Sequence, residues 1–540
     1  MKLVTVPEMQ AVEREANEQG LTYDKMMENA GQGLGNIIAS EYDYLETKKV
    51  LGLVGSGNNG GDTLVALIYL EKRDWDATAY IVRPRPENDP LMQQLNEAGG
   101  RIVQHEKDAR MNQLGSLLGE HSVLLDGVLG TGIRLPLKPE LGKVFLKVRS
   151  TISKLDTPPH VVAVDCPSGV DCDNGEAAPE CILAELTVTM AAVKSGLMRF
   201  PAANYTGELR VVNIGPVDDL PSWKQISAIV VDADIVLSIL PKRPRDAHKG
   251  TFGTALVVAG SVNYTGAAVL AGEAAYRIGA GLVTLAVPSP LHAALSGQFP
   301  EATWVLLPHD MGVIAADASE VLRKKLANVT AMLVGPGFGL EETTCEFISR
   351  LIASDQQTHH GGMGFVRSTA SSAAEEEVKL PPMVIDADGL KLLARLVDWQ
   401  SKLPNQTILT PHPGEMAVIS GLSKDEIQAD RINIAARFAK EWGHILVLKG
   451  AFTIIADPDG KIAVIPVATP ALARAGTGDV LAGLIVGLRA QGVDAFQAAM
   501  AGAWIHAQAG LLAAQQLGNA ASVMAGDVLR AVPQVLSKLY

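Results

Sequence analysis

The sequence predicts an α/β protein of two domains, each built on a largely parallel sheet. Three observations support this prediction. The 540 residues exceed the size of one ordinary domain. Short β-branched runs alternate with helical stretches, and most of these runs end at a glycine or an aspartate. A proline-rich segment of mixed charge interrupts the alternation once, near residues 216–228.

The first half of the chain has the pattern of a doubly wound sheet. Helical stretches separate its apolar runs, which favours parallel strands with helices on both faces. Ligands in such folds bind at the carboxyl ends of the strands. Thr5 and Glu8 have the spacing of a capping box, so we expect a helix to begin there. The runs are VLGLVG (50–55), ATAYIV (77–82), SVLLD (122–126) and HVVAVD (160–165).

The alternation resumes after the interruption and predicts a second α/β layer. We place the linker near 216–228 and expect domains at residues 1–220 and 226–540. No repeat of 20 to 50 residues indicates a solenoid. Residues 358–379 are small, polar and glycine-rich, which is typical of a surface insertion, and His359–His360 is a sparse metal-binding candidate. The strand-like runs lie at 254–260, 281–287, 331–335, 382–387, 407–410 and 444–450.

Composition limits the classes of partner. A net charge of −13 and a pI near 5.4 argue against a nucleic-acid surface, which needs a cationic excess. No run of 18 apolar residues predicts a membrane span, and the first residues lack the apolar core of a targeting segment. Four cysteines without a CxxC pair indicate reduced thiols. We therefore expect a soluble, cytoplasmic protein that acts on small molecules. Separately, we expect it to form a homo-oligomer.

A glycine-rich turn follows the first of these runs. Residues 55–62 read GSGNNGGD and contain the GxGxxG of a dinucleotide-binding turn, and we expect a helix to begin near Thr63. Such turns usually have an acid about 20 residues later to hold the ribose, whereas the next strand ends in Arg83. An NADP-dependent dehydrogenase is therefore one alternative. The side chains of Asn58, Asn59 and Asp62 suit sugar hydroxyls or a cation.

Two further strands end in aspartates, at Asp126 and Asp165. A buried aspartate is costly unless it is paired, capped or hydrated. Each one alone is as consistent with a helix cap as with a site. Together with the glycine-rich turn they predict a polar crevice at one edge of the sheet.

Four motifs in this order resemble the NAD(P)H-hydrate epimerase domain, also called the YjeF N-terminal domain: ENAG (28–31), GSGNNGGD (55–62), DGVLGTG (126–132) and DCPSG (165–169). The resemblance covers roughly residues 1–215. It implies that Asn59, Asp126 and Ser168 bind potassium and that Asp165 is the acid/base group. Thr63 replaces the glycine or alanine common in the family. The implied substrate-binding residues are Asn58, Asn59, Gly60, Gly61, Asp62, Gly130, Thr131, Gly132, Ile133, Arg134, Leu135, Pro136 and Asp165.

A second glycine-rich turn, AGTGD (475–479), runs directly into an apolar helix. Amides at a helix N-terminus can stabilise a transferring phosphoryl group, and an aspartate beside them can act as a base. A plain helix cap is the alternative. Four other motifs follow strands and should share the same sheet edge: GPGFG (335–339), DADG (386–389), HPGE (412–415) and KGAFT (449–453).

These motifs, with HKGTFG (248–253) and the alanine-rich run 260–283, resemble the ribokinase-like NAD(P)H-hydrate dehydratase domain, the YjeF C-terminal domain, over roughly residues 226–540. The resemblance implies Asp479 as the base. Residues 469–475 depart from the family pattern, and Arg474 there is a candidate phosphate contact. The implied contacts are Ala267, Gly337, His412 and Asp479 with the hydrate, and Lys449, Gly450, Ala451, Phe452, Thr453 and Gly478 with the adenine nucleotide.

Taken together, the two resemblances imply one repair pathway in a single chain. The first domain would interconvert the R and S forms of NADHX and NADPHX, the hydrates of NADH and NADPH. The second would dehydrate the S form with ADP as co-substrate, giving AMP and phosphate. Potassium (K+) and magnesium (Mg2+) are the implied metals. One alternative is a ribokinase-like sugar or vitamin kinase fused to a nucleotide-binding module. Another is a first domain that only binds a nucleotide or a protein.

Overall fold

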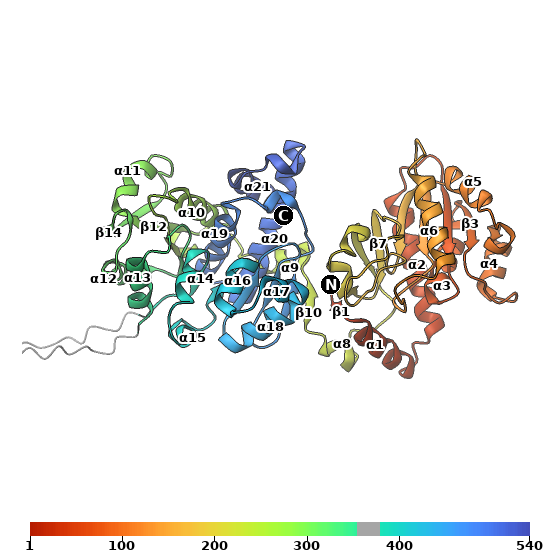
Figure 1. The fold of residues 1–540 in the computed structure, drawn as a ribbon, viewed down its shortest axis with the longest axis horizontal. Coiled ribbons are helices and arrows are strands. Elements are labelled where there is room, and N and C mark those ends of the chain that lie inside the picture. The colour runs from red at the N-terminus through yellow and green to blue at the C-terminus, as the bar shows by residue number, and fades with distance from the viewer. Residues whose placement is uncertain (354–378, 540) are drawn as a thin grey trace, which may run out of the picture. The chain divides into compact units, whose positions relative to one another are not determined.

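The computed structural model describes residues 1–353 and 379–539. Its contacts divide the chain into two compact units, Met1–Val230 and Val231–Tyr540 (Figure 1). The predicted His359–His360 candidate lies outside the described residues. Each unit is a mixed α/β structure with a large sheet, which confirms the predicted fold class.

The main sheet of the first unit is entirely parallel, in the order β4-β3-β2-β5-β6-β7-β9. The chain moves outward from β2 to β4 and then restarts on the other side of β2 with β5. This reversal creates a crevice at the carboxyl ends of β2 and β5. The strands of the unit are β1 (Leu3–Val4), β2 (Lys49–Val54), β3 (Asp76–Ile81), β4 (Arg101–Gln104), β5 (Val123–Gly127), β6 (His160–Val164), β7 (Leu186–Met190), β8 (Val193–Lys194), β9 (Glu208–Val212) and β10 (Ala228–Val230).

Helices cover both faces of this sheet, because successive strand residues alternate between two cores. Val50 and Val54 belong to one buried cluster, and Leu51 and Leu53 to the other. The first helix begins with the predicted capping box of Thr5 and Glu8. The helices are α1 (Val6–Glu18), α2 (Tyr23–Glu41), α3 (Asn58–Glu71), α4 (Pro90–Ala98), α5 (Asn112–Glu120), α6 (Pro139–Ile152), α7 (Ala203–Thr206) and α8 (Pro221–Gln225).

The segment expected to be a linker is folded within the first unit. It forms α8, and Val217, Leu220, Trp223 and Ile226 join the same buried cluster as α1 and α2. These apolar residues recur every three positions, which places them on one side of the segment. Burial of these four apolar side chains stabilises the folded segment more than its prolines favour an open loop.

The large sheet of the second unit runs in the order β21-β20-β19-β18-β17-β16-β11-β12-β13. The neighbours from β19 to β13 are parallel, and β20 and β21 are antiparallel. All six predicted strands are present, whereas β13, β20 and β21 were not predicted. The strands are β11 (Thr254–Val258), β12 (Leu282–Pro288), β13 (Thr303–Leu307), β14 (His309–Asp310), β15 (Val313–Ile314), β16 (Ala331–Val334), β17 (Met383–Ile385), β18 (Ile408–Leu409), β19 (Ile445–Leu448), β20 (Ile454–Ala456) and β21 (Ile462–Val464).

The sheet of the second unit packs against α19, α10 and α20, and α19 also contacts α10, α20 and α21 (Figure 1). No helix among the described residues is both long and apolar enough to span a membrane. The helices are α9 (Ala233–Ile239), α10 (Gly266–Arg277), α11 (His292–Leu295), α12 (Ala318–Arg323), α13 (Glu342–Ile352), α14 (Asp388–Leu393), α15 (Trp399–Lys402), α16 (Pro413–Ser420), α17 (Lys424–Ala429), α18 (Arg431–Trp442), α19 (Thr477–Ala490), α20 (Ala495–Leu517) and α21 (Ala525–Ser537).

Trp223→Ala should destabilise the first unit by about 3 kcal/mol, because it leaves a cavity in a packed cluster. Urea unfolding followed by circular dichroism measures the change. Leu183→Ala is the control, since this leucine of the same unit is 64% exposed. If both variants change the free energy of unfolding by the same small amount, residues 216–228 are an unpacked linker.

Candidate functional site

A cavity of about 600 Å³ lies in the first unit, at the crevice where the strand order reverses. Loops after β2, β5 and β6 line it together with α1 and α2. Of the predicted substrate-binding residues, Gly60, Gly61, Arg134, Leu135 and Pro136 are not among the lining residues. The predicted residues that do line the cavity are Asn58, Asn59, Asp62, Gly130, Thr131, Gly132, Ile133 and Asp165.

Helix α3 begins at Asn58, five residues before the predicted start, so the asparagines lie in its first turn. The glycines explain the difference. A Cβ on Gly60 would come within 2.1 Å of the Gly55 carbonyl oxygen, and one on Gly55 within 2.0 Å of the Val128 carbonyl oxygen. These glycines let the helix, its preceding turn and the loop after β5 approach one another. Gly55 and Gly60 are therefore needed where one backbone segment packs directly against another.

The three predicted potassium ligands form one hydrogen-bonded chain. The Asn59 side-chain amide donates to the Leu129 carbonyl at 2.9 Å, the Leu129 N–H to Ser168 Oγ at 2.9 Å, and the Ser168 N–H to Asp126 Oδ2 at 2.8 Å. Asn59 Oδ1 and Asp126 Oδ1 are buried and accept no hydrogen bond from any residue that the structure describes. Burial raises the pKa of Asp126, against the hydrogen bonds from Ser168. Two unpaired acceptors in one cluster suit a hard cation such as potassium.

Asp165 is held by a lysine that sequence reasoning missed. Lys194 Nζ lies 2.5 Å from Asp165 Oδ1 and is fully buried, and it also donates to Thr189 Oγ1 and the Met190 carbonyl. Burial lowers the pKa of Lys194, but the charge of Asp165, its hydrogen bond and the two nearby cysteines together outweigh burial, so that the pKa lies above its ordinary value. Asp165 also has a left-handed φ of +63°. Its carboxylate is therefore fixed in position beside the cavity.

Two further carboxyl groups line the same cavity. Burial, followed by the negative charge of Asp165, raises the pKa of Asp62 well above its ordinary value. Burial likewise raises the pKa of Glu13. Asp62, whose raised pKa favours the protonated form, thus lies near the carboxylate of Asp165, which is paired with Lys194. Acid/base chemistry needs this combination of a proton donor and a proton acceptor.

The second unit has a cavity of about 440 Å³ between the N-terminus of α19 and the end of its sheet. Of the predicted nucleotide contacts, Phe452 is absent from its lining. His412, assigned above to the hydrate, lines this cavity, and burial lowers the pKa of its imidazole. The predicted nucleotide contacts that line it are Lys449, Gly450, Ala451, Thr453 and Gly478.

A buried charge cluster adjoins this cavity. Lys449 Nζ lies 2.6 Å from Asp386 Oδ1 and 3.5 Å from Glu415 Oε2, and Thr410 Oγ1 donates to Asp386 Oδ1 at 2.8 Å. Burial lowers the pKa of Lys449, but Asp386 and Glu415 outweigh it, so that its pKa is raised. Asp386 Oδ2 is buried and has no hydrogen-bond partner in the described part of the chain, and a Cβ on Gly478 would lie 3.9 Å from it. This cluster therefore reaches the first turn of α19.

Asp479 lies in that first turn, after Gly476 with its left-handed φ of +86°. Burial and then the charge of Asp386 raise the pKa of Asp479 to about 7. A carboxyl with this pKa can accept a proton near neutral pH.

Ala267 and Gly337 are close neighbours, as the hydrate assignment requires. A Cβ on Gly337 would lie 2.9 Å from Ala267 Cβ, and Gly337 has a left-handed φ of +67°. Neither residue lines the cavity at α19. Ala267 lies at the start of α10 and Gly337 follows β16, both at the carboxyl side of the sheet.

The atypical loop at 469–475 lines the cavity through Thr469, Leu472, Ala473 and Arg474. The Arg474 guanidinium donates to the Ala521 carbonyl, so one of its hydrogen bonds is already used by the protein. His506 of α20 also lines the cavity, and burial lowers its pKa to about 4. His506 was not predicted, because a lone histidine in an apolar helix reads as an ordinary core residue.

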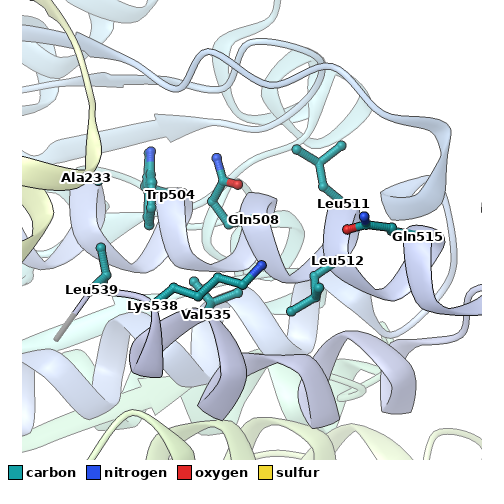
Figure 2. A pocket seen from close by; sticks show the side chains of 9 residues that line it. All are labelled: Ala233, Trp504, Gln508, Leu511, Leu512, Gln515, Val535, Lys538 and Leu539. Atoms are coloured by element: carbon teal, nitrogen blue, oxygen red, sulfur yellow. The ribbon is translucent and has the colours of Figure 1, made fainter. Parts of the chain in front are cut away.

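A third hollow, of about 380 Å³, lies between α9, α20 and α21 (Figure 2). Trp504, Gln508 and Leu511 enter it from α20, and Lys538 follows α21. None of the described residues that line it carries a carboxyl group or an imidazole, and we assign it no reaction.

Family comparisons agree with the motifs. A family model described as NAD(P)H-hydrate dehydratase matches residues 255–534, and one described as YjeF-related protein N-terminus matches residues 23–196. A bifunctional NAD(P)H-hydrate repair enzyme of Moorella thermoacetica is 35% identical, over 100% of this chain and 97% of its own length. The chain belongs to the family of bifunctional NAD(P)H-hydrate repair enzymes. A second such enzyme, from Thermofilum pendens, is 31% identical over 96% of this chain and 93% of its own length.

Among solved structures, an ADP/ATP-dependent NAD(P)H-hydrate dehydratase from Bacillus subtilis, co-crystallised with ATP and Mg2+, is 28% identical. It covers 58% of this chain and 99% of its own, with a TM-score of 0.46. The two family models and the full-length relatives confirm the resemblance inferred from the motifs for both halves of this NAD(P)H-hydrate repair family member.

Lys194→Met should destabilise the first unit by about 3 kcal/mol, because it leaves Asp165 buried without its cation. Urea unfolding measures the change. The double variant Lys194→Met/Asp165→Leu should recover much of this loss, since an apolar pair replaces the ion pair. Additive losses in the double variant would contradict the buried pairing.

Proposed function

We propose that the chain repairs hydrated NADH and NADPH in two steps. Residues 1–220 would interconvert the R and S epimers of NADHX and NADPHX. Residues 226–540 would dehydrate the S epimer with ADP, giving the reduced dinucleotide, AMP and phosphate. The observation that carries the proposal is that each unit has its own cavity with a carboxyl group near it that is suited to proton transfer. Asp165 lines the first cavity, and Asp479 directly follows Gly478, which lines the second.

In the first cavity, Asp165 would take the proton from the hydroxyl on carbon 6 of the hydrate. The oxygen would then form a carbonyl while the bond between carbon 6 and the ring nitrogen breaks and the nitrogen takes a proton. The nitrogen would release that proton as it attacks the other face of the carbonyl, which inverts carbon 6, and Asp165 would return the first proton to the oxygen. Lys194 supports this role because its charge keeps a carboxylate beside the cavity. Asp62, with its raised pKa, can supply a proton to the ring in the same cycle.

In the second cavity, Asp479 would take the proton from the same hydroxyl of the S epimer. The hydroxyl oxygen then attacks the terminal phosphorus of ADP, and AMP leaves. Phosphate is a far better leaving group than hydroxide, so it departs with its oxygen while a proton is lost from carbon 5. The amides at the start of α19 and Lys449 lie where they can stabilise the transferred charge.

We also propose a potassium ion at Asn59, Asp126 and Ser168. The unpaired acceptors Asn59 Oδ1 and Asp126 Oδ1 support it. The ion would supply a fixed positive charge beside the loop after β5 and hold that loop against α3.

Mg2+ would screen the phosphates of the nucleotide during transfer. The buried, unpaired Asp386 Oδ2 is an oxygen of the kind that this ion prefers. Within residues 1–353 and 379–539, no group of three or more histidine, cysteine, aspartate or glutamate side chains could hold a metal. Most ligands of Mg2+ would therefore come from phosphate and water. The co-crystallised Bacillus subtilis relative supports the use of ATP or ADP with Mg2+.

Asp165→Ala should reduce R-to-S interconversion at least about 100-fold while leaving dehydration of the pure S epimer intact, since only the first cavity loses its acid/base group. Asp479→Ala should do the reverse. Chromatography of the epimers and recovery of reduced-nicotinamide absorbance with ADP measure the two activities. Loss of both activities in either variant, or phosphorylation of a vitamin with ATP and no turnover of NADHX, would contradict the proposal.

The dehydration rate should fall below about pH 7, by about tenfold per pH unit, because protonation of Asp479 removes the base. The raised pKa means that this carboxyl is ionised only above about pH 7. Initial rates with saturating S-NADHX and ADP from about pH 5.5 to 8.5 measure the profile. A flat profile across this range would exclude Asp479 as the base.

A further inference from the structure

Two basic side chains line the cavity of the first unit, Arg83 and Lys194. Lys194 is neutralised by its pairing with Asp165. The Arg83 guanidinium is half-buried and makes no hydrogen bond or ion pair with any residue that the structure describes. Arg83 therefore supplies the cavity with positive charge that the protein itself does not use.

The place of Arg83 in the fold is well defined. It follows β3, which pairs in parallel with β2, and Val54 lies opposite Ile81. The Arg83 N–H approaches the Val54 carbonyl at 3.5 Å, directly before the glycine-rich turn. Ser56, Gly57 and Asn58 of that turn line the same cavity. Arg83 thus lies beside the turn, at the ends of the two neighbouring strands.

The next arginine fixes this arrangement. Arg85 Nη1 donates to the Gly55 carbonyl at 2.9 Å and to the Gly57 carbonyl at 3.3 Å, and its Nε pairs with Asp89 at 2.7 Å. Pro84 and Pro86 restrict the backbone on either side of Arg85. The segment is held to the turn, so that the Arg83 backbone has little freedom to leave the cavity.

The end of the second strand is where doubly wound sheets distinguish the two dinucleotides. An acid there binds the ribose 2′-hydroxyl of NAD, whereas an arginine accommodates the 2′-phosphate of NADP. Residues 82–86 read VRPRP and contain no acid, and the buried Asp89 is already paired with Arg85. A guanidinium can bind a phosphate through two parallel hydrogen bonds.

We propose that Arg83 binds the 2′-phosphate of NADPHX and makes the epimerase domain select NADPHX over NADHX. The proposal rests on the proposed function of this domain. It assigns to Arg83 the discrimination between two substrates that differ only in this phosphate.

The test compares R-to-S interconversion of NADPHX and NADHX without added nucleotide, so that only the first domain acts. Arg83→Ala should lower kcat/KM for NADPHX about tenfold or more through KM, and leave NADHX within about twofold. Arg83→Lys should retain part of the preference. Arg101→Ala is the matched control, because this arginine is exposed at the start of β4. Its kinetics should not change.

Two results would overturn the assignment. Equal losses for both substrates in Arg83→Ala would place the contact at a phosphate that they share. An unchanged NADPHX preference would exclude Arg83 from recognition.

A binding measurement separates this proposal from the proposed function. Arg83→Ala should weaken binding of 2′,5′-ADP about tenfold and leave binding of 5′-AMP unchanged in calorimetry. If the unsubstituted protein interconverts neither hydrate, the proposed function fails, and this difference still tests Arg83. Equal binding of 2′,5′-ADP by both proteins would overturn the proposal.

Discussion

A buried lysine paired with a strand-end aspartate organises the candidate site of each unit. Lys194 pairs with Asp165 in one and Lys449 with Asp386 in the other, and in each pair both side chains are at least largely buried. Burying one of these charges alone would be strongly unfavourable, so each partner requires the other. Because the carboxyl ends of parallel strands meet at one edge, the pair also fixes where the neighbouring loops converge.

Near each ion pair lie buried polar atoms that have no hydrogen-bond partner among the described residues. Among the described residues, the buried atoms without a hydrogen-bond partner include Asn59 Oδ1 and Asp126 Oδ1 in the first unit and Asp386 Oδ2 in the second. Such groups are costly unless something binds them, and these three lie in the two candidate sites, about which the net charge of −13 says nothing. The overall field repels nucleotides, and binding must come from local amides, cations and single basic residues such as Arg83.

Several features were predictable because they depend on local pattern. The six strands of the second unit and the capping box at Thr5 follow from periodicity and residue type. Lys194 was not predictable, since a lysine after an apolar run is usually a solvated strand end. The predicted start of α3, near Thr63, was too late, because glycine disfavours a helix when only local propensity is considered. Here the helix includes Gly60, since only a glycine lets its first turn approach Gly55 so closely.

The sequence by itself determined the α/β class, the order of the motifs and their membership of one family, because these depend on residue type and spacing along the chain. Only the tertiary structure decided which side chains share a cavity. The strand order reverses between β2 and β5, and this reversal brings Asn59, Asp165 and Arg83 to one crevice although they follow three different strands. Burial and neighbouring charge, which no linear pattern specifies, then set the pKa values of Asp62 and Asp479.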